Sequence, residues 1–132
     1  MADLSSILSA IAADSLLTSW NPVVETLPDY ELKDTKTAKC CVVPGGIDFR
    51  NLSRGSIHHT FTVEIGFIKR SKSLNVLSLV TEIKGIADGL MPKTFSDARV
   101  VGVAYEPLYD EEQLRERNLF QGVLSVKLEE VK

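Results

Sequence analysis

One long alternating segment constrains the fold of this chain more than any other feature. Over residues 56–70, SIHHTFTVEIGFIKR, apolar side chains alternate with mostly polar ones. Successive side chains of a strand point to opposite faces, so the segment is predicted to be a strand with an apolar and a polar face. About thirteen residues span roughly 43 Å, whereas a domain of this length has a diameter of roughly 36 Å. The strand must therefore bend, for instance at Gly66, or its end must project from the body.

A projecting strand end has consequences for function. Its unpaired backbone N–H and C=O groups can be covered by a neighbouring subunit. The segment is thus a first indication of a protein that assembles rather than catalyses.

Length and charge set further limits. The 132 residues are expected to form one domain, 1–132, of a soluble globular kind. A net charge of −3 opposes a broad basic surface for DNA, although it suits a protein lining a channel through which DNA slides. No apolar stretch approaches the length of a membrane span, and the first residues do not form a signal peptide. The adjacent Cys40 and Cys41 are expected to be buried thiols, as in a protein made in a reducing cytoplasm.

The remaining pattern predicts two helices and further strands. An amphipathic helix begins near Asp3 or Ser5 and either breaks near Ala13-Asp14 or is covered on both sides. A second helix is expected after a turn and cap at 70–73, with an apolar face from Val76 to Leu90, and Gly85 within it suggests close contact with a neighbouring group. Strands are expected at 38–43, 57–70, 98–109 and 119–131, with a further short strand possible at Val23-Val24 and an exposed loop over 44–56. The prediction is an α+β domain whose mostly antiparallel sheet of about four strands carries both helices on one face, in the order α-β-β-α-β-β.

Motifs for catalysis are lacking in the sequence. His58 and His59 are neighbours on a strand, so they face opposite ways and cannot share a metal ion. The Pro44-Gly45-Gly46 turn lacks the rest of a phosphate-binding loop. No nucleophile elbow is present either. We therefore expect a protein that is not an enzyme and has no catalytic residue, metal or cofactor.

Two features fit subunit contacts as well as ordinary surface and core. The charged segment 106–117 is either a solvated face or a source of salt bridges across a subunit boundary. The large amphipathic rings of Trp20, Tyr30, Tyr105 and Tyr109 suit either interface anchors or the core.

The whole layout resembles the small tail terminator, or tail completion, proteins of long-tailed bacteriophages. The resemblance lies in the order of an amphipathic helix (LSSILSAIAADSLLTSW), a short strand (CCVVPG), a loop ending in SRGS and the long strand IHHTFTVEIGFIKR. A helix (LNVLSLVTEIKGIADGL) and two strands (ARVVGVAYEPLYDEEQL and FQGVLSVKLEEV) follow.

This resemblance implies a virion protein made in the cytoplasm of the host bacterium. It implies a homo-oligomeric ring, typically a hexamer, that caps the head-proximal end of the tail tube and stops tube polymerisation. Its partners would be the tail tube protein and the head connector or neck protein, with duplex DNA passing through the pore without sequence-specific binding and no membrane contact. It carries over no catalytic residue.

The predicted subunit or tail interface consists of eight residues: Arg50, Arg54, His59, Glu64, Tyr109, Glu112, Arg115 and Arg117. Two alternatives stay open: a neck, head-closure or other minor tail protein, or a small-molecule-binding α+β module of a different class. The second alternative predicts a pocket with convergent polar groups.

Overall fold

A computed structural model describes residues 3–24, 38–53, 56–70, 76–106, 108–117 and 119–130. The elements in chain order are α1 (Leu4–Ala12), the 3-10 helix η1 (Ser15–Trp20), β1 (Pro22–Val24), β2 (Lys39–Ser53), β3 (Ser56–Arg70), α2 (Val76–Leu90), β4 (Thr94–Phe95), β5 (Ala98–Tyr105), α3 (Glu111–Arg117) and β6 (Leu119–Glu130). The predicted α+β class is confirmed.

The sheet is larger than the sequence predicts. It has six strands in the order β1-β2-β3-β6-β5-β4. β1 runs parallel to β2, and every other neighbouring pair is antiparallel. The prediction of about four antiparallel strands is therefore wrong in number, and the predicted element order omits η1, β1, β4 and α3. The short strand that the sequence allowed at Val23-Val24 is present as β1. β1 and β4 have three and two residues, too few for a period of two to emerge.

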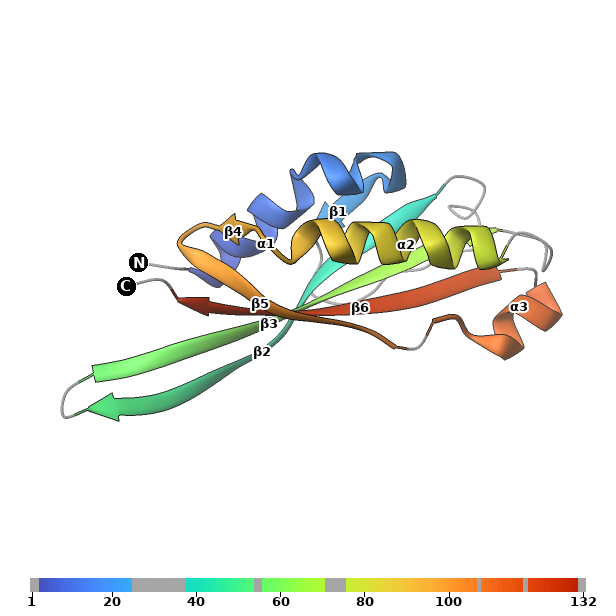
Figure 1. Ribbon diagram of the computed structural model, residues 1–132. Coiled ribbons are helices and arrows are strands. Elements are labelled where there is room, and N and C mark those ends of the chain that lie inside the picture. Colours follow the sequence, from blue (N-terminus) through green and yellow to red (C-terminus); the bar gives the residue numbers. More distant parts are fainter. Residues whose placement is uncertain are drawn as a thin grey trace.

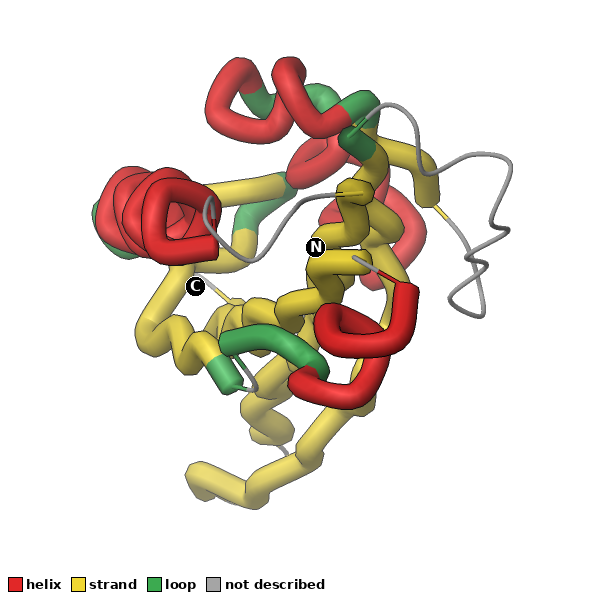
Figure 2. Tube along the Cα trace, turned by 90° about the vertical axis from the view of Figure 1, so that its right-hand side faces the viewer, coloured by secondary structure: helices red, strands yellow, loops and turns green. Residues whose placement is uncertain are grey.

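The helices and the sheet form layers. α1 and α2 lie over the same face of the sheet, while α3 lies at the end of the sheet opposite the β2–β3 hairpin (Figure 1). In the turned view the strands fill the middle and extend to the lower edge of the molecule (Figure 2). The expectation of two main helices on one face is therefore confirmed.

The core lies between this face and the two helices. Alternate residues of β3, from Phe61 to Phe67, are buried there, as the period of two requires. Trp20 is 1% exposed, packs edge-on against Phe67 with ring centroids 5.1 Å apart, and donates from Nε1 to Oε1 of Glu82 at 3.0 Å. Trp20 is therefore a core residue in this chain, not an exposed anchor.

The break that the sequence allowed near Ala13-Asp14 is present. α1 ends at Ala12, and the Asp14 carboxylate accepts a hydrogen bond from the Leu16 N–H at 2.9 Å, which caps η1. The same carboxylate pairs with the Lys93 ammonium at 2.7 Å. Burial alone would raise the pKa of Asp14, but the Lys93 and Leu16 hydrogen bonds outweigh it and the pKa is lowered. Asp14 thus fixes the break to the turn that follows α2.

The second helix is present over Val76–Leu90 and ends where the sequence predicts. The expected close contact at Gly85 is wrong, because this residue is exposed and a Cβ there would meet nothing within 4 Å. The tight position is Gly89 instead, where a Cβ would lie 2.8 Å from Cδ1 of Leu16. Gly85 faces away from α1, η1 and the sheet, whereas Gly89 lets η1 approach α2.

Both cysteines are fully buried thiols, as predicted. Their positions on β2 place them on opposite faces of the sheet. Burial raises the pKa of the Cys40 thiol to about 12.

Candidate assembly surface

The β2–β3 hairpin extends beyond the rest of the sheet. β1 pairs with β2 only at residues 40–42, and β6 pairs with β3 only from Thr60 to Arg70. Residues 47–53 and 56–59, here named the arm, have only each other as strand partners among the described residues. Figure 1 shows the hairpin leaving the body at the lower left. Of the two expectations for the long strand, projection of its end is the one observed.

The predicted loop over 44–56 is wrong, because β2 continues through this segment to Ser53. A register shift falls between Pro44, opposite Val63, and Gly46, opposite Thr62, so Gly45 is an extra residue. A Cβ on Gly45 would lie 3.0 Å from the Thr62 carbonyl oxygen, which explains why glycine stands at this bulge.

The bulge also changes which residues face the helices, from even-numbered before it to odd-numbered after it. Before it, even-numbered residues such as Val42 face the helices. After it, Ile47 and Phe49 do so, opposite Phe61 and His59. This change of parity hides the alternation in the sequence and makes the segment read as a loop.

One face of the arm is apolar and exposed. Ile47 is 38% and Phe49 68% exposed. Phe49 meets the His59 ring edge-on at a centroid distance of 5.1 Å, and His59 stacks on Phe61 at 6.2 Å. Nδ1 of His59 lies 2.8 Å from Oε2 of Glu130, which fixes the imidazole. The predicted interface residue His59 therefore anchors the base of the arm to the end of β6.

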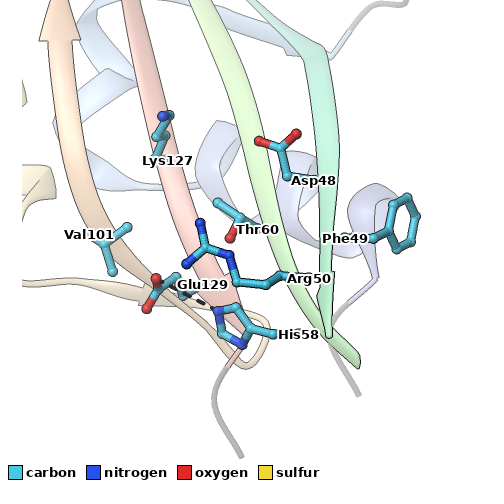
Figure 3. Close-up of a pocket in the computed structure, with 8 residues that line it drawn as sticks. All are labelled: Asp48, Phe49, Arg50, His58, Thr60, Val101, Lys127 and Glu129. Atoms are coloured by element: carbon cyan, nitrogen blue, oxygen red, sulfur yellow. Dashed lines mark ion pairs between the residues drawn. The ribbon is translucent and has the colours of Figure 1, made fainter. Parts of the chain in front are cut away.

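The opposite face of the arm is polar. A hollow of about 390 Å³ is lined by Asp48, Phe49, Arg50, His58, Thr60, Val101, Lys127 and Glu129. Nε2 of His58 lies 3.7 Å from Oε1 of Glu129, too far for a hydrogen bond, so the contact is an ion pair only when the imidazole is protonated. In Figure 3 Arg50 extends across the strands on this side, and Phe49 points away from the other side chains. No ion pair joins Asp48 or Arg50 to another side chain in the part of the chain that the structure describes.

The eight predicted interface residues fall into separate groups. Arg50 and His59 belong to the arm, on opposite faces. Glu64 is exposed on the polar face of the sheet, between Val43 and Ser125. Arg54 lies outside the described residues.

The other four lie near α3, at the far end of the sheet (Figure 1). Glu112 and Arg115 are exposed on α3, and Tyr109 is half-buried against the core. Arg117 ends α3, and its side chain lies outside the described part. The structure therefore does not gather the predicted residues into one site.

The segment before α3 is attached to its own chain. The N–H groups of Glu106 and Asp110 donate to the carbonyls of Val123 and Gln121 at 3.0 and 3.1 Å, so the segment follows β6. The Tyr105 hydroxyl donates to the Leu108 carbonyl at 2.8 Å, and burial raises the pKa of Tyr105 to about 12. The predicted strand over 98–109 therefore ends at Tyr105.

The sequence interpretation missed three exposed residues of the arm, Ile47, Asp48 and Phe49. It also missed the two acids at the end of β6. The adjacent pairs His58-His59 and Glu129-Glu130 were a usable signal, because neighbouring antiparallel strands bring such pairs together on both faces.

The described residues contain no group of three or more His, Cys, Asp or Glu side chains that could hold a metal ion. No helix among them is long and apolar enough to cross a membrane. The expectation that the chain is not an enzyme stays a prediction.

Comparison with known proteins gives a distant likeness to solved structures. No protein-family model matches the chain, and no curated protein does. Among solved structures, a chain from the virion of a native gene transfer agent particle is similar, with 15% identity and a TM-score of 0.49 over 95% of this chain and 92% of that one. A likeness this distant carries no argument about function.

Proposed function

We propose that this chain is a structural protein of a phage-like virion, and that it acts as a tail terminator. In this role copies close into a ring, typically a hexamer, on the head-proximal end of a tail tube. The ring stops tube polymerisation and offers its other face to a head connector or neck protein. The proposal is supported by the layout that resembles this family and by the arm.

The arm is the observation that carries the proposal. A two-stranded extension with an exposed phenylalanine and an open backbone edge is costly for an isolated protein, since such edges pair with other chains. Exposed apolar side chains at such an edge suit contact with another protein. An assembling protein uses these groups, whereas an enzyme with its site in the body has no need of them.

Ring closure needs two different surfaces on each copy. The arm and α3 lie at opposite ends of the sheet (Figure 1), and head-to-tail contacts between unlike surfaces generate rings when their rotation closes. We assign the neighbour contact to the base of the arm in β3 and to the 106–117 segment. The net charge of −3 suits a pore through which duplex DNA passes without being held.

Electron microscopy of the purified protein, alone and mixed with tail tubes, tests the proposal. We expect closed rings, with a pore at least as wide as duplex DNA, at one end of the tubes. Deleting the gene should give overlong or unjoined tails. Normal particles from the deletion strain would rule the proposal out.

A neck, head-closure or other minor tail protein is the alternative within the virion. Purified tail tubes and filled heads separate the two, because a terminator binds the end of a tube in the absence of heads. A protein that binds only filled heads belongs to the neck.

The hollow beside the arm favours a second candidate, a small-molecule-binding module. Its volume of about 390 Å³ and its convergent polar side chains Asp48, Arg50 and Lys127 fit a small polar ligand. This function predicts a protein that never forms rings and whose melting temperature rises with a ligand. Substitution Lys127→Ala should remove such a rise.

A further inference from the structure

Along the arm, the outer edge of β2 has no strand partner among the described residues. Among the described residues, β1 covers this edge only as far as Val42. Pro44 cannot donate a backbone hydrogen bond, so it limits pairing on the body side. From Gly46 to Leu52 the edge presents backbone groups that another strand can pair with.

The charges along this edge are complementary to those of a second copy that runs antiparallel to it. Asp48 and Arg50 are two residues apart, so they lie on the same face with opposite charges. When two copies of the edge run antiparallel and centre on Phe49, Asp48 of each lies opposite Arg50 of the other. Directly opposite side chains point to the same face, so both charge pairs form.

Among registers centred on residues 48 to 50, the alternation and the charges favour this one. Centring on Asp48 or on Arg50 would place two like charges opposite each other, which is destabilising. A shift by one residue would bring opposite faces together and is excluded by the alternation. Of the registers centred on 48, 49 or 50, only the one at Phe49 matches every charge.

The other face of the same register is apolar. Phe49 lies opposite Phe49 of the second copy, and its ring is 68% exposed in the single chain. Pairing would remove both rings from water, and aromatic pairs add to that gain. Arg50 makes no ion pair within the described residues, so no charge contact is broken when it turns to its new partner.

We propose that two copies of this chain pair edge to edge through β2, about a two-fold axis at Phe49. The contact joins the two sheets into one continuous sheet. It is short, so the dimer is weak and reversible. A strand edge pairs with one partner at a time. The dimer therefore blocks the arm, and a copy in the dimer cannot use the same edge to bind other proteins of a virion.

Disulfide trapping tests the two-fold axis directly. A residue on the axis meets its own copy, so Phe49→Cys should form a 49–49 disulfide under mild oxidation. The matched control is Leu77→Cys, on α2 and 77% exposed. The native cysteines are fully buried and do not interfere. Trapping at 49 should be at least about tenfold faster than at 77, and equal rates would overturn the proposal.

Charge exchange tests the register. Asp48→Arg and Arg50→Asp each turn two attractive pairs into repulsive ones, so each should raise the dimer dissociation constant by about tenfold or more. The double variant D48R/R50D restores both pairs in reversed order and should return to within about threefold of the original. Sedimentation over a concentration series measures these constants, and circular dichroism checks that each variant is folded.

The outcomes separate this proposal from the proposed ring. A protein that is monomeric at every concentration, or a double variant no better than the single ones, would overturn the dimer. If rings form on tail tubes but no 49–49 disulfide forms, the proposed dimer is refuted and the proposed ring is supported. If the 49–49 disulfide forms but the reduced protein never binds tubes, the proposed ring is refuted and the proposed dimer is supported.

Discussion

Three glycines give a sharp test of the packing. Gly85 in α2 and Gly122 in β6 have opposite surroundings. A Cβ on Gly85 would meet nothing within 4 Å, while one on Gly122 would lie 2.7 Å from the Leu108 carbonyl oxygen and 3.1 Å from the Tyr105 hydroxyl. Alanine should therefore stabilise the chain at Gly85 and destabilise it at Gly122.

The magnitudes follow from the two environments. Alanine is favoured over glycine in a helix interior by about 1 kcal/mol, so Gly85→Ala should raise the free energy of unfolding by about 0.5–1 kcal/mol. A chain of this size then gains roughly 2–4 °C in melting temperature. At Gly122 the nearest atom belongs to the backbone and cannot turn away, so overpacking should cost about 1–3 kcal/mol.

Gly89 is the internal control. Alanine there has the same helical advantage, but its Cβ would lie 2.8 Å from the Leu16 side chain. A side chain can move where a carbonyl cannot, so Gly89→Ala should fall between the other two.

Urea unfolding followed by circular dichroism measures all three, and the slope with urea should stay constant because the surface exposed on unfolding is unchanged. If Gly85→Ala destabilises the isolated chain, then the outer face of α2 is covered and the reasoning is wrong. If Gly122→Ala is neutral, then the 106–110 segment does not pack on β6 as described.

Three further predictions concern the core and its edges. The pKa of Asp14 is lowered in the folded chain. The stabilisation by the Asp14 carboxylate is therefore complete above the pKa of the unfolded chain, near 4, and is lost as the pH falls through the lower pKa of the folded chain. Asp14→Asn should reduce the loss of stability between about pH 5 and pH 2 in acid titrations followed by fluorescence. The Cys40 thiol, with a pKa of about 12 and no exposed area, should react with a thiol reagent at pH 8 only after unfolding, and labelling of the native chain at the rate of a free thiol would contradict its burial. Trp20→Phe removes the hydrogen bond to Glu82 and leaves a partial cavity, so it should destabilise the chain by about 1–2 kcal/mol in the same urea assay; an unchanged midpoint would mean that the ring is not buried in solution.

Local periodicity was enough for the elements that bury one face. β3, α2 and β6 each carry a complete apolar repeat, so their types and nearly all of their bounds followed from spacing alone. The break after Ala12 was one of the two arrangements that the two apolar stripes allowed, the other being a helix covered on both sides.

The remaining features depend on contacts distant in sequence. β4 is too short to carry a period, and β2 was misread because Gly45 interrupts its alternation. The pairing of His59 with Glu130 depends on the register between β3 and β6, and no local pattern states that register. The predicted interface was spread over both ends of the sheet for the same reason: the sequence shows which residues are charged, but not which share a surface.

The bulge at Gly45 separates the chemistry of the hairpin end from its direction. One residue removed there would leave Pro44 and Gly46 in ordinary alternation, with Ile47 and Phe49 still facing the helices and Asp48 and Arg50 still facing away. Only the bend and extra twist that such insertions impose would be lost. A chain lacking Gly45 would therefore carry the same side chains on a straighter hairpin. Its affinity for a partner would show how much binding depends on the direction in which the hairpin points.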